Sequence, residues 1–111
     1  MKQIIVYKRY FVDFYEKLSQ KEQNKVDHAL ALLRTDEFIP IHYIKYLRDG
    51  IYELRVTLGN NELRVFYTYD GDKIVVLFNG FRKKTQKTPM SELEKAKRER
   101  NDYIARKESI L

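Results

Sequence analysis

The 111-residue chain contains no cysteine and no tryptophan, and it has only four glycines and two prolines. Without cysteine, disulfide bonds and thiolate metal sites are excluded. The hydrophobic content of 43% suits a compact domain that buries a core without such covalent or metal support. We therefore expect one domain over residues 1–111.

Long hydrophobic runs are missing as well. The apolar residues Ile4–Val6 end at Tyr7-Lys8-Arg9, which is too short for the apolar segment of a signal peptide. No run approaches the ~20 residues that span a bilayer. We expect a soluble, cytoplasmic protein with no membrane partner, and the lack of cysteine fits a reducing compartment.

Acidic residues are fewer than basic ones, and the formal net charge is +6. The excess is uneven, because residues 82–108 hold ten lysines and arginines against five acidic residues, whereas the rest of the chain holds twelve against eleven. A localised positive field attracts a polyanion or an acidic partner. A positive charge needed only for solubility would be more scattered.

The hydrophobic periodicity predicts an α+β fold. Residues 4–7 form a short strand, and two amphipathic helices follow, of which the second begins at the capping box Ser19 to Glu22. Residues 51–58, 62–69 and 73–81 are rich in β-branched and aromatic side chains and predict a three-stranded antiparallel meander. Ser91 and Glu94 predict a second capping box and a final helix that lies loosely on the surface. The helical hairpin would pack on this mainly antiparallel sheet.

Strand alternation assigns side chains to the two faces of the meander. If the turns centre on Asn60-Asn61 and Asp70-Gly71, one apolar face lies under the helical hairpin; moving the first turn to Gly59-Asn60 changes partners but not faces. That face comprises Leu54, Val56, Leu58, Leu63, Val65, Tyr67, Ile74, Val76 and Phe78. The opposite face comprises Glu53, Arg55, Thr57, Arg64, Phe66 and Thr68.

Arg55 and Arg64 fall beside each other on the polar face, where like charges are destabilising unless an anion lies between them. Two explanations stay open: Glu53 or Glu62 neutralises the pair, or the arginines clamp a phosphate. Phe66 lies between them as an expected stacking surface for a base. The basic residues Arg82, Lys83, Lys84 and Lys87 after the third strand would extend this positive groove.

Three stretches resemble the phage-derived HigB-like branch of the RelE/ParE toxin superfamily. They are Lys45–Val56, Glu62–Tyr67 and Val76–Pro89, and the block Phe81–Pro89 (FRKKTQKTP), followed by a helix rich in Glu, Ala and Arg, is the most distinctive part. The resemblance covers about residues 43–100. It implies a RelE-like, microbial-ribonuclease-like fold.

The resemblance also implies an activity: metal-independent cleavage of messenger RNA in the ribosomal A site. By position, Arg55, Arg64, Lys83 and Lys84 match the catalytic basic residues of the family. Lys45, Phe66, Arg82 and Lys87 are the expected RNA-binding residues, and Tyr67 is a weaker candidate because alternation places it in the core. The RNA would supply its own 2′-hydroxyl nucleophile, so no metal or cofactor is expected.

The expected partners are the ribosome and a helix-turn-helix antitoxin of the HigA type, with operator DNA reached only through that antitoxin. Two other functions stay open, namely a ParE-like gyrase poison on the same scaffold and a non-catalytic RNA-binding module. Of the two histidines, His28 is expected to be a helix residue, whereas His42 could border the groove near Lys45.

Overall fold

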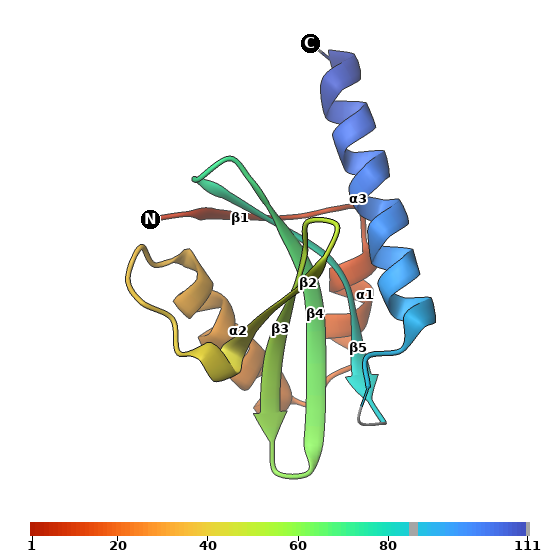
Figure 1. Cartoon of the computed structure of the whole chain (residues 1–111). Helices are drawn as coiled ribbons and strands as arrows, with labels where there is room; N and C mark the ends of the chain where they lie inside the picture. Colours follow the sequence, from red (N-terminus) through yellow and green to blue (C-terminus); the bar gives the residue numbers. More distant parts are fainter. Residues whose placement is uncertain (85–86, 111) are drawn as a thin grey trace.

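The computed structural model describes residues 1–84 and 87–110 (Figure 1). The elements are β1 (Gln3–Val6), α1 (Tyr10–Glu16), α2 (Gln20–Arg34), the 3-10 turn η1 (Ile41–Tyr43), β2 (Ile44–Arg48), β3 (Ile51–Leu58), β4 (Asn61–Asp70), β5 (Ile74–Lys83) and α3 (Met90–Ile110). The five strands form one sheet in the order β1-β5-β4-β3-β2. β1 runs parallel to β5, and the other neighbours are antiparallel. The α+β class with a mainly antiparallel sheet is confirmed.

The predicted capping box at the start of α2 is present. The Ser19 hydroxyl accepts from the Glu22 backbone N–H at 3.2 Å, and the Glu22 carboxylate accepts from the Ser19 N–H at 3.0 Å. The second predicted box is wrong, because α3 begins at Met90 and Ser91 therefore lies within its first turn. There the Pro89 carbonyl accepts from the backbone N–H groups of Glu92 and Leu93.

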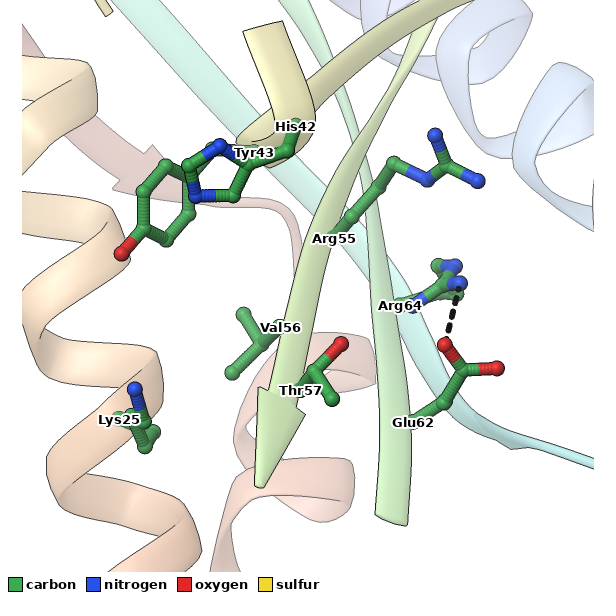
Figure 2. Close-up of a pocket in the computed structure, with 8 residues that line it drawn as sticks. All are labelled: Lys25, His42, Tyr43, Arg55, Val56, Thr57, Glu62 and Arg64. Carbon is green, nitrogen blue, oxygen red and sulfur yellow. Dashed lines mark hydrogen bonds and ion pairs between the residues drawn. The ribbon is translucent and has the colours of Figure 1, made fainter. Parts of the chain in front are cut away.

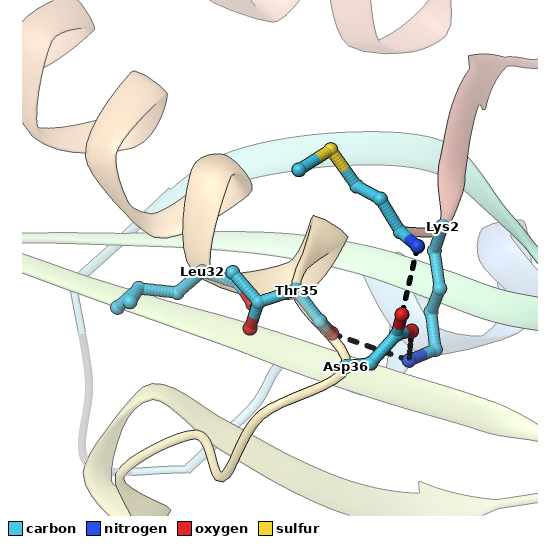
Figure 3. A network of polar contacts seen from close by, with 5 residues as sticks. Lys2, Leu32, Thr35 and Asp36 are labelled. Carbon is cyan, nitrogen blue, oxygen red and sulfur yellow. Dashed lines mark hydrogen bonds and ion pairs between the residues drawn. The ribbon is translucent and has the colours of Figure 1, made fainter.

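The end of α2 is fixed to the start of β1 by a small polar network (Figure 3). The Lys2 ammonium donates to the Thr35 carbonyl at 3.3 Å and to the Asp36 carboxylate at 3.4 Å. The Thr35 hydroxyl donates to the Leu32 carbonyl at 2.8 Å and so closes the last turn of the helix. These contacts set the start of β1 beside the end of the helical hairpin.

The α1 and α2 helices cover one face of the sheet, as expected. Val26, Ala29 and Leu33 of α2 are fully buried against this face. The strand residues in the same core are Leu54, Val56, Leu63, Val65, Tyr67, Val75 and Leu77. The face assignments for β3 and β4 are therefore correct. The first hairpin turns at Gly59-Asn60, with Leu58 opposite Asn61, which is the alternative of the two expected turns.

The face assignment for β5 is wrong. Asp70 pairs with Ile74, so the loop between β4 and β5 holds three residues rather than two. This odd offset turns the side chains in the first part of β5 to the other face, and Val75 and Leu77 point at α1 and α2 in place of the expected Ile74, Val76 and Phe78.

A second irregularity lies further along the same pair of strands. Val65 faces Gly80 whereas Tyr67 faces Leu77, so β5 has one extra residue opposite Phe66. Such a β-bulge reverses the alternation again beyond this point. Arg82 consequently shares a face with Leu63 and α2, and Lys83 shares the opposite face with Glu62.

The C-terminal helix packs more closely than expected. Leu93, Ala96 and Glu99 of α3 are buried on the second face of the sheet. They cover a second core formed with Ile51, Phe66, Val76, Phe78 and Phe81. The sheet is therefore covered on both faces, and the prediction of a loosely attached helix is wrong. No described helix combines the length and apolar character that crossing a membrane requires.

Candidate functional site

The α3 helix leaves one end of its face of the sheet uncovered. In Figure 1 the helix starts beside the end of β5 and runs away from the hairpin that joins β3 to β4. Near this hairpin Arg55 lies opposite Arg64, and Glu62 lies opposite Lys83. The register therefore brings Arg55, Arg64 and Lys83, three of the four expected catalytic residues, to the same face of adjacent strands.

Arg64 is a buried residue, which contradicts the expectation that Arg55 and Arg64 form an exposed phosphate clamp. Its side chain is 3% exposed, and its Nε lies 3.7 Å from Oε1 of Glu53. The terminal Nη1 donates to the Leu63 carbonyl at 2.9 Å, and Nη2 donates to Oε1 of Glu62 at 3.5 Å. The expectation that both arginines face solvent is wrong, because the Arg64 side chain is buried against Glu53, Glu62 and the Leu63 carbonyl.

Arg55 is the accessible member of the pair. Its side chain is 35% exposed, and only its Nε approaches a carboxylate, at 3.8 Å from Oε1 of Glu53. Its two terminal nitrogens have no hydrogen-bond partner among residues 1–84 and 87–110. Figure 2 shows this guanidinium extending from β3 on the same side as Arg64. It lines a hollow of about 380 Å³ together with Lys25, His42, Tyr43, Val56, Thr57, Glu62 and Arg64.

Glu53 explains how two arginines can lie side by side. Its side chain is 1% exposed, and the same oxygen, Oε1, approaches both arginine Nε atoms. The other oxygen accepts from the Thr88 hydroxyl at 2.7 Å. One buried carboxylate therefore neutralises the repulsion and ties the segment after β5 to the arginine pair. The expectation that Glu53 or Glu62 could neutralise the pair is met by both, since Glu62 also contacts Arg64.

Two expected RNA-binding residues lie elsewhere. Phe66 is fully buried beneath α3, with its ring 5.4 Å from that of Phe81, so an exposed stacking surface at this residue is wrong. Arg82 points to the opposite face and forms a two-point ion pair with Glu22, at 2.6 and 3.1 Å. These hydrogen bonds lower the pKa of Glu22 to about 2 and raise the pKa of Arg82. Arg82 therefore anchors β5 to α2.

The remaining basic residues border the hairpin end of the sheet. Lys83 is half-buried beside Glu62, and Lys84 and Lys87 are exposed in the segment that follows β5. Lys45 is exposed on β2, opposite Glu53 in register. Thr85 and Gln86 of the basic block lie outside the described residues.

Lys25 and Tyr43 are site residues that the sequence did not reveal. They come from α2 and η1 and reach the hollow across the edge of β3, next to the point where β2 begins at Ile44. His42 borders the same hollow, with its ring 4.3 Å from that of Tyr43. These residues lie beside β3 because β2 begins only at Ile44, and no local pattern in the sequence predicts that start.

Tyr67 is not suited to proton transfer. Its side chain is fully buried in the core under the helices, and burial raises the pKa of its hydroxyl. In the described part of the chain, no cluster of three or more histidine or acidic side chains could hold a metal ion.

Comparison with known protein families identifies the family of the chain. The family described as "Phage derived protein Gp49-like (DUF891)" matches residues 13–101. This range includes Glu53, both arginines and the basic segment after β5. No curated protein matches the chain.

Proposed function

Because the chain belongs to the Gp49-like phage-derived family, a toxin-like family related to RelE and HigB, we propose that it is a ribosome-dependent messenger RNA endoribonuclease. It would act as a single toxin domain over residues 1–111 and inhibit translation. The observation that carries this proposal is the partly exposed Arg55 guanidinium, whose Nε lies 3.8 Å from buried Glu53 and whose two terminal nitrogens have no hydrogen-bond partner among the described residues. Such an edge matches the oxygens of one phosphate.

The chemistry follows from what phosphodiester cleavage requires. The RNA 2′-hydroxyl must lose its proton, the negative phosphorane must be stabilised, and the 5′-oxygen must gain a proton. Arg55 stabilises the phosphorane, and Lys83 and Lys84 are the candidates for the proton transfers. A lysine is suited to donate a proton near neutral pH, and it acts as a base only where nearby cations lower its pKa.

The other residues have supporting roles in this proposal. Arg64 positions Arg55 through the shared Glu53 oxygen and is not itself in contact with RNA. Lys45 and Lys87, which are both exposed, are the candidates for contacts with neighbouring phosphates. The proposal gives Phe66 and Arg82 no contact with RNA, since Phe66 is buried and Arg82 is paired with Glu22.

The partners follow from the family. Membership of a toxin–antitoxin family implies an antitoxin. We propose that this antitoxin is a helix-turn-helix protein of the HigA type. The toxin would contact operator DNA only through this antitoxin. The substrate is messenger RNA in the ribosomal A site, and the protein acts in the cytoplasm.

Purified ribosomes programmed with a defined message test the function. We expect the wild-type protein to cut the message within the A-site codon, with primer extension locating the cut, and to leave ribosome-free message intact. Trapped gyrase–DNA complexes without message cleavage would instead identify a gyrase poison. Binding of RNA without any cut would identify a non-catalytic module.

A further inference from the structure

A groove lies between α1 and α3, over β5 and away from Arg55. It consists of two adjoining hollows of about 370 and 310 Å³ that share Tyr10 and Lys95, and we call it the α1–α3 groove. Gly80 of β5 forms part of it, where an added Cβ would lie 2.4 Å from the Phe14 ring. The missing side chain at Gly80 therefore lets α1 approach the sheet. Figure 1 shows α1 and α3 beside β5, whereas β3 and β2 lie on the other side of β4.

The α1–α3 groove carries cations that lack acidic partners. Lys17, Lys95 and Arg98 line it, and the described part of the chain provides no carboxylate within ion-pair distance of them. Two of its three acidic residues are already paired: Asp13 lies 3.2 Å from Nε of Arg9, and Asp102 lies 3.0 Å from Nε of Arg106 and 3.3 Å from the Lys8 ammonium. The third, Glu99, is buried and interacts with Lys95 and Arg98 without forming an ion pair. The uncompensated charge of the groove is therefore positive.

Buried polar atoms beneath the groove also lack donors. Both carboxylate oxygens of Glu99 and the side-chain oxygen of Asn79 are buried and make no hydrogen bond of ordinary geometry with the described residues. Glu99 is 4% exposed, and burial raises its pKa to about 7 although Lys95 opposes the shift. The carboxyl is therefore partly protonated near neutral pH and offsets less of the positive charge.

We propose that the α1–α3 groove binds an acidic amphipathic segment of the antitoxin. This inference rests on the proposed function, because only a toxin requires such a partner. The apolar side chains of the segment would pack on Phe14 and Leu18, which line the groove, while its carboxylates would pair with Lys17, Lys95 and Arg98. Complementary charges of this kind direct association and fix the register of the partner.

A protein segment suits the groove better than RNA does. The groove is lined in part by the apolar side chains of Phe14 and Leu18, which suit the apolar side chains of a protein segment and offer nothing to a phosphate backbone. The Tyr10 ring, one of two aromatic rings that line the groove, already has the Lys95 ammonium 5.5 Å from its centroid. The inference has a consequence for neutralisation: the antitoxin would leave Arg55 uncovered and prevent toxicity by keeping the protein off the ribosome.

Charge reversal in the groove tests the inference. The chain is co-expressed with the product of the reading frame adjacent to its own, and the complex is purified and its Kd measured. The variant Lys17→Glu/Lys95→Glu should raise Kd by at least ~100-fold, since both groove contacts become repulsive. Growth inhibition by this variant should no longer be relieved by the partner. The matched control is Lys21→Glu/Lys73→Glu, which makes the same charge change at exposed positions outside the groove and should bind as the wild type does.

Thermal unfolding and cleavage on ribosomes complete the test. The groove variant should unfold within a few degrees of the wild type and retain its cleavage rate. The inference would be overturned if a folded groove variant bound the partner as tightly as the wild type does, or if the wild type formed no complex at all. It would also be overturned if the groove variant kept its partner binding and lost RNA cleavage. If the wild type cuts no message but its partner binding depends on the groove, the function fails and the groove assignment stands.

Discussion

Replacement of Arg55 by alanine is expected to lower the rate of message cleavage by about 100- to 1,000-fold, the usual loss when one donor to a developing oxyanion is removed. The Arg55 side chain is 35% exposed and makes one long contact with Glu53, so the protein should remain folded. Single-turnover cleavage on programmed ribosomes measures the loss. Arg55→Lys should recover only part of the rate, because an ammonium cannot bind two phosphate oxygens in a planar fork.

Arg9→Ala is the matched control for this prediction. Arg9 is also an exposed arginine that pairs with a nearby carboxylate, at 3.2 Å from Asp13, but it lies before α1 and outside the Arg55 hollow. The Arg9→Ala variant should cleave the message at the same rate as the wild type. A folded Arg55→Ala protein with an undiminished rate would remove Arg55 from the reaction.

Replacement of Arg64 by alanine is expected to destabilise the fold by about 3 kcal/mol, because removing one member of a buried ion pair leaves the other charge without compensation. Arg64 is 3% exposed and bridges Glu53 and Glu62, and its Nη1 satisfies the Leu63 carbonyl. The truncation also leaves a cavity between β4 and its neighbours. Urea unfolding followed by circular dichroism measures the change.

Arg55→Ala is the control for this prediction. Its partly exposed ion pair contributes less than about 1 kcal/mol to the free energy of unfolding. If Arg64→Ala were as stable as Arg55→Ala, the structural role of Arg64 would be refuted. The distinction matters for any test of activity. Loss of toxicity in Arg64→Ala reports unfolding as readily as lost chemistry, whereas loss in Arg55→Ala isolates the chemistry.

The sequence predicts what local patterns determine. The α2 capping box, the helical hairpin and the alternation along β3 and β4 each depend on residues close together in the chain, and each is present. The turn at Gly59-Asn60 was one of two options, and both leave the faces unchanged. The juxtaposition of Arg55 and Arg64 follows from that alternation and is also correct.

The parity of β5 could not be predicted, because it depends on one loop residue and one bulge. A three-residue loop at Gly71–Lys73 and a two-residue turn at Asp70-Gly71 both suit the same composition. The bulge opposite Phe66 then decides that Lys83, rather than Arg82, shares a face with Arg64. These two irregularities determine which basic residue reaches the site.

The burial of Phe66 was missed for another reason. Alternation places it correctly on the face away from α1 and α2, but only the packing of α3 shows that this half of the face is covered. The buried stripe of α3 includes Ala96 and Glu99, which hydrophobic periodicity does not register as a core-facing pattern. The packing of α3 alone therefore decides which part of the polar face is buried and which part is exposed.

Side-chain NMR of the arginines during titration with a short single-stranded RNA tests the central claim most directly. A 2′-O-methylated RNA is used so that no cleavage occurs. The Nε–Hε resonance of Arg55 should shift and should return towards its free position as salt is raised, because phosphate binding is salt-dependent. The Arg64 resonance and the amides of the α1–α3 groove should change little. Shifts confined to the groove, with Arg55 unmoved, would contradict the assignment of Arg55 as the phosphate-binding residue.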